Sequence, residues 1–459
     1  MFTDTKVRAI IRDLGDGLVL RRSRPEDTEA LVAFHAALHS DAGPDKPDER
    51  VAAWTRDLMT RPHPIFRPED FTIVEDTSSG KIVSSMNLIS QTWAYEGIPF
   101  GVGRPELVAT LSEYRDRGLI RAQFDEIHKW SSERGEMMQV ITGIPFFYRQ
   151  FGYEMGLELG GGRVGFEAQL PKLKEDEKEP YILRPAAEAD IPFLMQVYAH
   201  ACRRSLITCL RDEALWGYEL TGQSEKNVNR NEIRIIESAE GEPVGYLIHP
   251  STNWSTGLMA LAYELKPGVS WLAVTPSVAR YLWQTGGEYA ARQDWEGGQP
   301  DEQKKRSRAA YGFWLGTQHP VYEVFHEKLP RLRDPYAWYL RVPDLPGFIR
   351  HIVPVLEKRV AESMVVGYSG QVKIGFYRSG LRMVFENGCL TGVEAWQPAA
   401  RDWGQAAFPD LTFLQLVFGY RTFEELEQSH ADCWYESDEV RVVLSVLFPK
   451  KPSAVMPVV

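Results

Sequence analysis

The sequence predicts an α/β and α+β protein built from three units: two successive mixed sheets flanked by helices, then a smaller α+β unit. Three observations support this. The segment PKLKEDEKEPY is a charged run between prolines without periodicity, typical of a linker. The chain repeats one order of strands and helices on its two sides, and its pattern changes near Leu340. The predicted boundaries are 1–170, a linker at 171–181, 182–339 and 340–459.

Each of the first two units is expected to begin with a strand, a turn and a helix. LVLRRSRPEDTEALVAFHA (18–36) and ILRPAAEADIPFLMQVYAH (182–200) both end an apolar strand in Leu-Arg and then open an amphipathic helix. Asp27 and Asp190 fall in the first helical turn, where acids are favoured by the helix dipole.

Further matches follow in the same order. FTIVEDTSSGKIVSSMNLI (71–89) and IRIIESAEGEPVGYLIH (233–249) are predicted hairpins with a glycine in the turn. GIPFFYRQFGYE (143–154) has a counterpart in GTQHPVYEVFHEKL (316–329). Four matches in register indicate a duplicated α/β unit.

The segment ELVATLSEYRDRGLIRAQF (106–124) predicts a strand, a turn and a helix. The first amides of a helix lack intrahelical partners and carry partial positive charge, so they favour a phosphate or pyrophosphate. Gly118 lets the chain approach such an anion, and Arg115 and Arg117 add charge. A plain helix start with solvated arginines is the alternative. YELKPGVSWLAVTPSVARYLW (263–283) repeats the elements without the arginine–glycine loop, with an N-cap predicted at Thr275-Pro276.

The last unit is expected to combine helices with a small sheet. VPDLPGFIRHIVPVLEKRVAES (342–363) predicts an amphipathic helix entered through prolines. VKIGFYRSGLRMVFENGCLTGVEAW (372–396) predicts three strands joined by Ser-Gly and Asn-Gly turns. LTFLQLVFGY (411–420) and TFEELEQS (422–429) predict helices.

Composition excludes several classes of protein. A net charge of −11 over 459 residues argues against a phosphate-bound nucleic-acid partner; it suits a cationic substrate, or solubility alone. Four cysteines without a Cys-x-x-Cys pair do not make a disulfide framework. We expect no signal peptide, no membrane span and a cytoplasmic location.

Two weak motifs are set aside. GGGRVG (160–165) fits a dinucleotide pattern, but no helix is predicted after it. His35 and His39 lie four residues apart on a predicted helix without a third ligand, so we expect no metal. They form either a structural pair or part of the substrate side.

Residues 104–154 resemble the GNAT superfamily of acetyl-coenzyme A-dependent N-acetyltransferases, whose pyrophosphate loop reads Arg/Gln-x-x-Gly-x-Gly/Ala. Here the loop is Arg115 to Ile120, and Ile120 departs from the small residue usual at its end. The resemblance makes Tyr148 the general acid that protonates the leaving thiolate; read without it, Tyr148 belongs to an aromatic core. It implies that acetyl-coenzyme A contacts Val108, Ala109, Thr110, Arg115, Asp116, Arg117, Gly118, Leu119, Ile120, Arg121, Gly143 and Ile144.

The order of units resembles the enhanced intracellular survival (Eis) family of acetyltransferases, with tandem GNAT folds, the second degenerate, and a sterol carrier protein-like third domain. Known members are homo-oligomers that acetylate aminoglycosides or lysine. In them the carboxylate ending the chain is the general base, which implies Val459 here. A frayed terminus is the alternative, with Glu106 or a water as the base.

The predicted function is therefore transfer of acetyl from acetyl-coenzyme A to a primary amine of an aminoglycoside-, polyamine- or lysine-like acceptor. Position suggests Trp54, Trp93 and Tyr95 as pocket residues, although each also suits a core. The alternatives are a protein binding an apolar ligand in its third unit, with a vestigial GNAT half, and an acyl-coenzyme A sensor.

Overall fold

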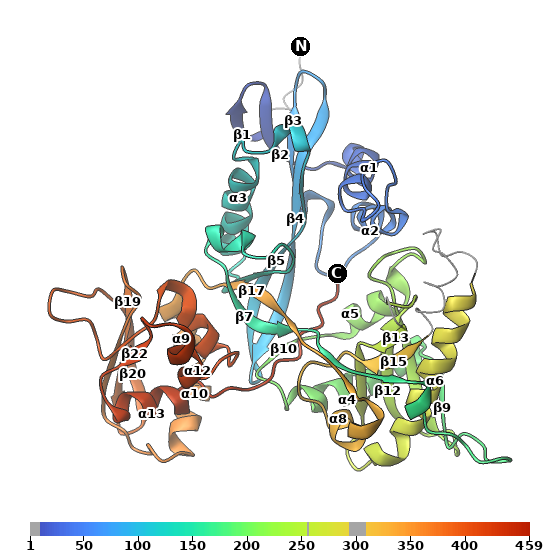
Figure 1. Ribbon diagram of the computed structural model, residues 1–459. Helices are drawn as coiled ribbons and strands as arrows, with labels where there is room; N and C mark the ends of the chain where they lie inside the picture. The colour runs from blue at the N-terminus through green and yellow to red at the C-terminus, as the bar shows by residue number, and fades with distance from the viewer. Residues whose placement is uncertain (1–9, 255–256, 293–308) are drawn as a thin grey trace.

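The computed structural model describes residues 10–254, 257–292 and 309–459. Figure 1 shows a first unit built around two long strands, with a second and a third unit on either side of their lower end. The first unit contains β1 (Ile10–Gly15), β2 (Leu18–Arg22), α1 (Thr28–Leu38), α2 (Glu49–Thr60), β3 (Phe71–Asp76), β4 (Lys81–Tyr95), β5 (Ile98–Thr110), α3 (Leu119–Glu133), β6 (Met138–Ile141), the 3₁₀ helix η5 (Phe147–Phe151) and β7 (Glu154–Leu159).

The sheet of the first unit has the order β1-β2-β3-β4-β5-β6-β17-β7 in the described residues. Helices α1 and α2 cover one face and α3 covers the other (Figure 1). Because side chains alternate along a strand, β4 serves two cores. Ile89 packs with the helices α1 and α2, whereas Met86 and Leu88 pack with α3.

The second unit has two small sheets, ordered β14-β12-β11-β9 and β13-β15-β8-β16. Its elements are β8 (Gly162–Phe166), β9 (Tyr181–Pro185), α4 (Ile191–Cys202), β10 (Ile207–Cys209), α5 (Glu213–Gly217), the π-helical turn η8 (Tyr218–Gly222), β11 (Asn231–Ser238), β12 (Pro243–Pro250), β13 (Gly257–Ala260), β14 (Ala262–Leu265), α6 (Trp271–Ala291), β15 (Ala310–Phe313), α8 (Pro320–Val324), β16 (Arg331–Arg333) and β17 (Tyr336–Arg341).

The two units begin with the same ion-pair arrangement. Arg21, at the end of β2, donates from Nη1 and Nη2 to Asp27 at 2.7 Å and from Nε to Glu75 at 2.7 Å. In the second unit an arginine, a first-turn aspartate and a glutamate on the next strand repeat this pattern, with Nε and Nη donor–acceptor distances of 2.7–2.9 Å: Arg184, Asp190 and Glu237. The first-turn acids therefore tie each helix start to its sheet, besides facing the helix dipole.

The two units exchange one strand each. β17 pairs with both β6 and β7 of the first unit. In return β8 pairs with β15 and β16 of the second unit. Sequences on both sides of the linker are therefore interleaved, because the partners of β8 and β17 lie across it.

One predicted helix start is wrong. Helix α6 begins at Trp271, and the hydroxyl of its N-cap Ser270 accepts from the amide of Ala273. Pro276 lies inside the helix rather than at its start, so Thr275 is not the N-cap. Serine and threonine are both favoured at an N-cap, and here the earlier of the two, Ser270, takes that position.

The third unit follows with α9 (Leu345–His351), α10 (Val353–Ala361), β18 (Gly370–Gly375), β19 (Gly380–Glu386), β20 (Cys389–Trp396), β21 (Ala406–Ala407), α11 (Phe413–Val417), α12 (Phe423–Ser429), β22 (Trp434–Tyr435) and α13 (Asp438–Leu447). The predicted helix over 342–363 is two helices that meet at Ile352, because Pro354 in the first turn of α10 lacks the amide that would continue α9. No described helix combines the length and the apolar character that a bilayer crossing requires.

The tip of the β4–β5 hairpin is embedded in the third unit. Trp93 and Tyr95 are fully buried in a core shared with Phe348 and Phe418. The Tyr95 hydroxyl donates to the carbonyl of Val417 at 2.8 Å. The placement of Trp93 and Tyr95 in an acceptor pocket is therefore wrong, since both are core residues between two units.

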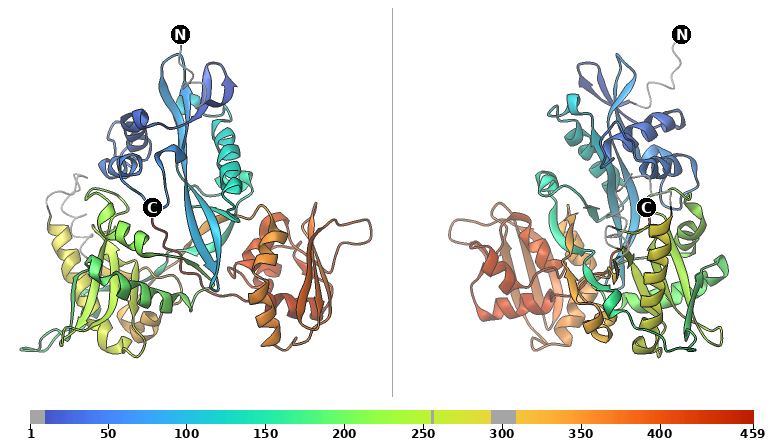
Figure 2. Two further views of the ribbon diagram at one scale, coloured as in Figure 1. Left: turned by 180° about the vertical axis from the view of Figure 1, so that it is seen from behind. Right: turned by 45° about the vertical axis from the view of Figure 1, so that its right-hand side comes forward.

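The segment after α13 crosses the molecule. It leaves the third unit, runs between the first and second units, and brings Val459 below α2 and above α5 (Figures 1 and 2). Ala454 forms a parallel bridge with Thr208 of β10 and donates to the carbonyl of Ile207 at 3.0 Å. Lys451 pairs with Glu96 at the hairpin tip at 2.5 Å. This segment, residues 449–459, is called the tail below.

Candidate active site

The loop between β5 and α3 leaves the first amides of the helix without hydrogen-bond partners in the described residues. Gly118 is the N-cap of α3 at φ 73°, and Asp116 also has a positive φ of 61°. In the described chain no acceptor lies within hydrogen-bonding distance of the amides of Leu119 and Ile120. Glycine is favoured at this left-handed φ, and a Cβ there would meet no atom within 4 Å. The loop fits an anionic group held by helix amides.

Three arginines surround this loop. Arg115 and Arg117 are exposed, and the guanidinium of Arg117 lies 5.1 Å from the ring centroid of Tyr114. Arg121 donates to Gln150 at 3.0 Å. The predicted loop residues therefore lie together, with cationic groups at the rim of the free amides.

Strand β5 carries a bulge opposite Met86. Ala109 pairs with Ser85 and Glu106 pairs with Asn87, so Leu107 and Val108 face a single residue of β4. Leu107 has a φ of 52°, which a leucine adopts only when the surrounding structure imposes it. A bulge takes backbone groups out of the ladder and leaves them available to a ligand.

Strand β5 and its neighbour β6 diverge before β5 reaches the bulge. The parallel pairing with β6 covers Val102–Met138 and Gly103–Gln139 only. Gly143 follows β6 at φ 124° and accepts a hydrogen bond from the Tyr336 hydroxyl at 3.0 Å. Ile144 is 60% exposed. The predicted contact residues Gly143 and Ile144 therefore lie where β5 and β6 have separated.

Tyr148, in η5, lies at this splay. A Cβ added to Gly143 would be 3.7 Å from its hydroxyl oxygen. The Tyr148 ring is buried among Phe124, Phe147 and Tyr339. Burial, followed by the negative charge of Glu106, raises the pKa of Tyr148 well above its usual value. The phenol therefore stays protonated at neutral pH and is available as a proton donor.

The end of the chain is docked rather than frayed. Val459 is 6% exposed and packs in one apolar cluster with Leu107, Trp54 and Phe34. Because Val108 packs against the cluster that contains Tyr148, the bulge has the end of the tail on one side and the tyrosine on the other.

The competing base is already engaged. Arg104 Nε donates to Glu106 Oε1 at 2.7 Å, and Arg104 Nη2 lies 2.5 Å from the same oxygen. The ion pair with Arg104 therefore occupies the Glu106 oxygen that an attacking amine would need to reach.

Several polar residues near the tail were not singled out in the sequence. Gln91 Nε2 donates to the carbonyl of Val458 at 3.1 Å, and Gln223 Nε2 donates to the terminal oxygen of Val459 at 3.0 Å. Arg211, buried in an ion pair with Glu219, donates to the carbonyl of Met456. No local pattern marks them, because their partner is distant in sequence.

His35 lies in α1 and His39 is the C-cap residue of the same helix. The rings of His35 and His39 stack with centroids 5.5 Å apart, and His35 Nε2 is 3.3 Å from the Ser85 hydroxyl. Burial lowers the pKa of both imidazoles, so both are neutral at pH 7. The described residues contain no group of three metal-ligating side chains.

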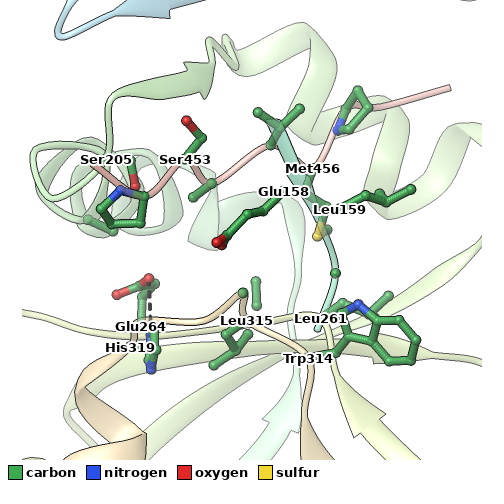
Figure 3. Close-up of a pocket in the computed structure, with 18 of the residues that line it drawn as sticks. Glu158, Leu159, Ser205, Leu261, Glu264, Trp314, Leu315, His319, Ser453 and Met456 are labelled. Atoms are coloured by element: carbon green, nitrogen blue, oxygen red, sulfur yellow. Dashed lines mark ion pairs between the residues drawn. The ribbon is translucent and has the colours of Figure 1, made fainter. Parts of the chain in front are cut away.

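A cavity of about 1120 Å³ extends from Val459 and Thr142 into the second unit. Its walls are the tail, the end of β7 and the segment after β15. Figure 3 shows the tail, with Ser453 and Met456, on one side of the cavity and Glu264, His319 and Leu315 on the other, with Glu158 between the two sides. Glu264 is paired with Arg204 at 2.6 Å, whereas Glu158 accepts, among the described residues, only from the Thr317 hydroxyl.

Comparison with known proteins assigns the class of the first unit. Residues 20–156 match the family model of the acetyltransferase (GNAT) domain. The match identifies an acetyltransferase (GNAT) domain in the first unit, which supports assigning the protein to the acyltransferases. A search of curated proteins finds no match.

Solved structures share the fold over nearly the whole chain. A probable N-acyltransferase of unknown function from Enterococcus faecalis superposes with a TM-score of 0.64 at 14% identity, covering 96% of this chain and 100% of its own. A GCN5-related N-acetyltransferase from Kribbella flavida gives 0.61 at 16%, covering 96% and 98%. Eis1 from Mycobacterium abscessus gives 0.55 at 13%, covering 95% and 98%. At these identities the likeness concerns the fold alone.

Proposed function

We propose that the protein transfers the acetyl group of acetyl-coenzyme A to a primary amine of an aminoglycoside-, polyamine- or lysine-like acceptor. The observation that carries the proposal is the bulge at Leu107–Val108, with Tyr148 on one side and the end of the tail on the other. An acyl transfer needs an activated acetyl group held between a base and an acid, and this arrangement offers such a place.

Acetyl-coenzyme A supplies the activated acetyl group. The amides at the start of α3 and the loop arginines hold its pyrophosphate, and the splay between β5 and Gly143 receives the pantetheine arm. A bulge amide donates to the thioester oxygen, where negative charge grows during the transfer.

The amine attacks the thioester carbon directly. Its proton goes to the Val459 carboxylate, which is not engaged by any cation in the described residues. As the carbon–sulfur bond breaks, the thiolate takes the proton of the Tyr148 hydroxyl. Glu106 and a water are the alternatives for the base.

The cavity supports a cationic acceptor. Among the lining groups without an ion pair in the described residues are Glu158, Glu323 and the Val459 carboxylate, against one guanidinium, that of Arg163. Excess negative charge in a partly enclosed space raises the local concentration of ammonium groups.

We further propose that the second unit is a GNAT-like repeat that binds no coenzyme A. Its repeated arginine–aspartate–glutamate arrangement supports a common origin. Ser270 caps the start of α6, and the hydroxyl of Tyr322 is held by Phe313 and Leu315, so neither is free for a cofactor. A sterol carrier-like third unit and homo-oligomer assembly stay predictions from the family resemblance, and a cytoplasmic location stays a prediction from the sequence.

Release of the coenzyme A thiol in the presence of primary amines tests the proposed function. Tyr148→Phe is expected to lower kcat by about 100-fold or more, in the usual range for a general acid, and to leave the affinity for acetyl-coenzyme A nearly unchanged. Tyr153→Phe is the control, because Tyr153 belongs to the same aromatic cluster but its hydroxyl is engaged by His128 at 2.9 Å. Equal turnover by the two variants would remove Tyr148 as the acid.

A further inference from the structure

The end of the tail is held by two glutamines from different units. Gln91 of β4 and Gln223, which follows η8, each donate one hydrogen bond to the last two residues. Both side chains are buried, with 7% and 3% of their surface exposed. The two glutamines differ in whether the amide oxygen has a hydrogen-bond partner.

The free oxygen of Gln223 has no partner. Gln91 Oε1 accepts from the indole of Trp93 at 2.8 Å. Gln223 Oε1 is buried and has no hydrogen-bond partner in the described residues. Because Gln223 Nε2 donates to a terminal oxygen, which only accepts, the orientation of its amide is fixed. A buried amide oxygen left unpaired costs about 1–3 kcal/mol, so such groups usually face a ligand or water.

Gln223 also lines a cavity that could hold a ligand. Gln223, Val459 and Asn229 line the same cavity. The Asn229 Nδ2 is a second buried polar atom that lacks a hydrogen-bond partner among the described residues. The residue that carries the base and two residues with an unpaired polar atom therefore line one cavity.

We infer that Gln223 is a positioning residue for the two partners of the proton transfer. Its Nε2 holds the Val459 carboxylate, and its Oε1 accepts a hydrogen bond from the attacking amine. The amine then has one N–H directed to the carboxylate that removes its proton and a second N–H directed to Gln223. The inference rests on the proposed function, and it gives the second unit a part in the chemistry of the first.

Methionine substitutions at the two glutamines test this inference, because they keep similar volume and remove the amide. Gln223→Met is expected to raise the acceptor KM by about tenfold and to lower kcat by about tenfold, each the loss of one hydrogen bond to a charged group. Gln91→Met, which also removes one tail contact, should lower kcat with little change in acceptor KM.

The pH profile separates positioning from folding. A hydrogen bond donated to a carboxylate lowers its pKa, so its loss in Gln223→Met moves the acidic limb of kcat/KM to higher pH. A purely structural defect would scale the profile without moving it. Equal acceptor KM values and equal profiles in the two variants would overturn the inference.

A readout independent of turnover distinguishes failure of this inference from failure of the proposed function. Carboxypeptidase should release Val459 faster from Gln223→Met than from the wild type, because the tail end is less firmly held. If the wild type binds no acetyl-coenzyme A and acetylates no amine, the proposed function fails and the acceptor contact falls with it. Release at the wild-type rate would instead contradict the tail contact.

Discussion

His63 illustrates how a single partly buried side chain links pH to stability. Its ring lies 4.2 Å from that of Tyr218 of the second unit, and its Nδ1 accepts from the amide of Ile65. Burial lowers the pKa of His63 to about 4. The unfolded chain, with a histidine pKa near 6.5, binds the proton more readily, so the stabilisation is complete above pH 6.5 and is lost as the pH falls toward 4.

His63→Asn should therefore reduce the acid sensitivity. The amide oxygen can accept from Ile65 as Nδ1 does, but it does not titrate. From pH 7.5 to 5, the stability of the variant relative to the wild type should rise by about 2 kcal/mol, measured by urea unfolding at both pH values. His326→Asn is the control, because His326 is exposed. Equal responses of the two variants would refute the assignment of a neutral, partly buried His63.

At the residue scale, local chemistry was predictable and long-range contacts were not. Gly118 and Tyr148 lie where the motif placed them, because a loop at a helix start is a local structure. Gln223 was not predicted from the sequence, because its hydrogen-bond partner is 236 residues away. Their roles in catalysis stay predictions.

Among the elements, the exchanged strand β8 explains the glycine-rich segment. A Cβ on Gly162 would lie 2.0 Å from the carbonyl oxygen of Phe313, and Gly162 has a φ of 145°. The glycines of GGGRVG thus permit close strand packing, which agrees with rejecting a dinucleotide loop. Sequence pattern could exclude that loop but could not predict the exchange, because pairing between distant strands leaves no periodic signal.

Gly162→Ala should consequently destabilise the joined units. We expect the free energy of unfolding to fall by about 3 kcal/mol or more, from backbone strain and overpacking, and thermal unfolding measures it. Gly217→Ala is the matched control in α5, where a Cβ would meet no atom within 4 Å. Alanine is the better helix former, so this variant should be neutral or stabilised. Equal melting temperatures would contradict the close approach at β8.

For the whole molecule, the tail connects all three units. It starts in the third unit, bridges to β10 of the second and ends beneath helices of the first. The duplicated order of strands and helices was readable because periodicity and turn residues are local. The interleaving was not readable, since it depends on contacts between segments far apart in the chain. We propose that the molecule has one coenzyme A site, in the first unit.

Calorimetric titration with acetyl-coenzyme A tests this central claim most directly. We expect one molecule bound per chain, and no binding by Gly118→Asp, whose carboxylate would repel the pyrophosphate. Gly118→Asn is the control, because asparagine tolerates the left-handed conformation as aspartate does but carries no charge. Its affinity should stay within about tenfold of the wild type, a cost of roughly 1 kcal/mol for the strained backbone. Two molecules per chain, undiminished binding by Gly118→Asp, or no binding by the wild type would contradict the account.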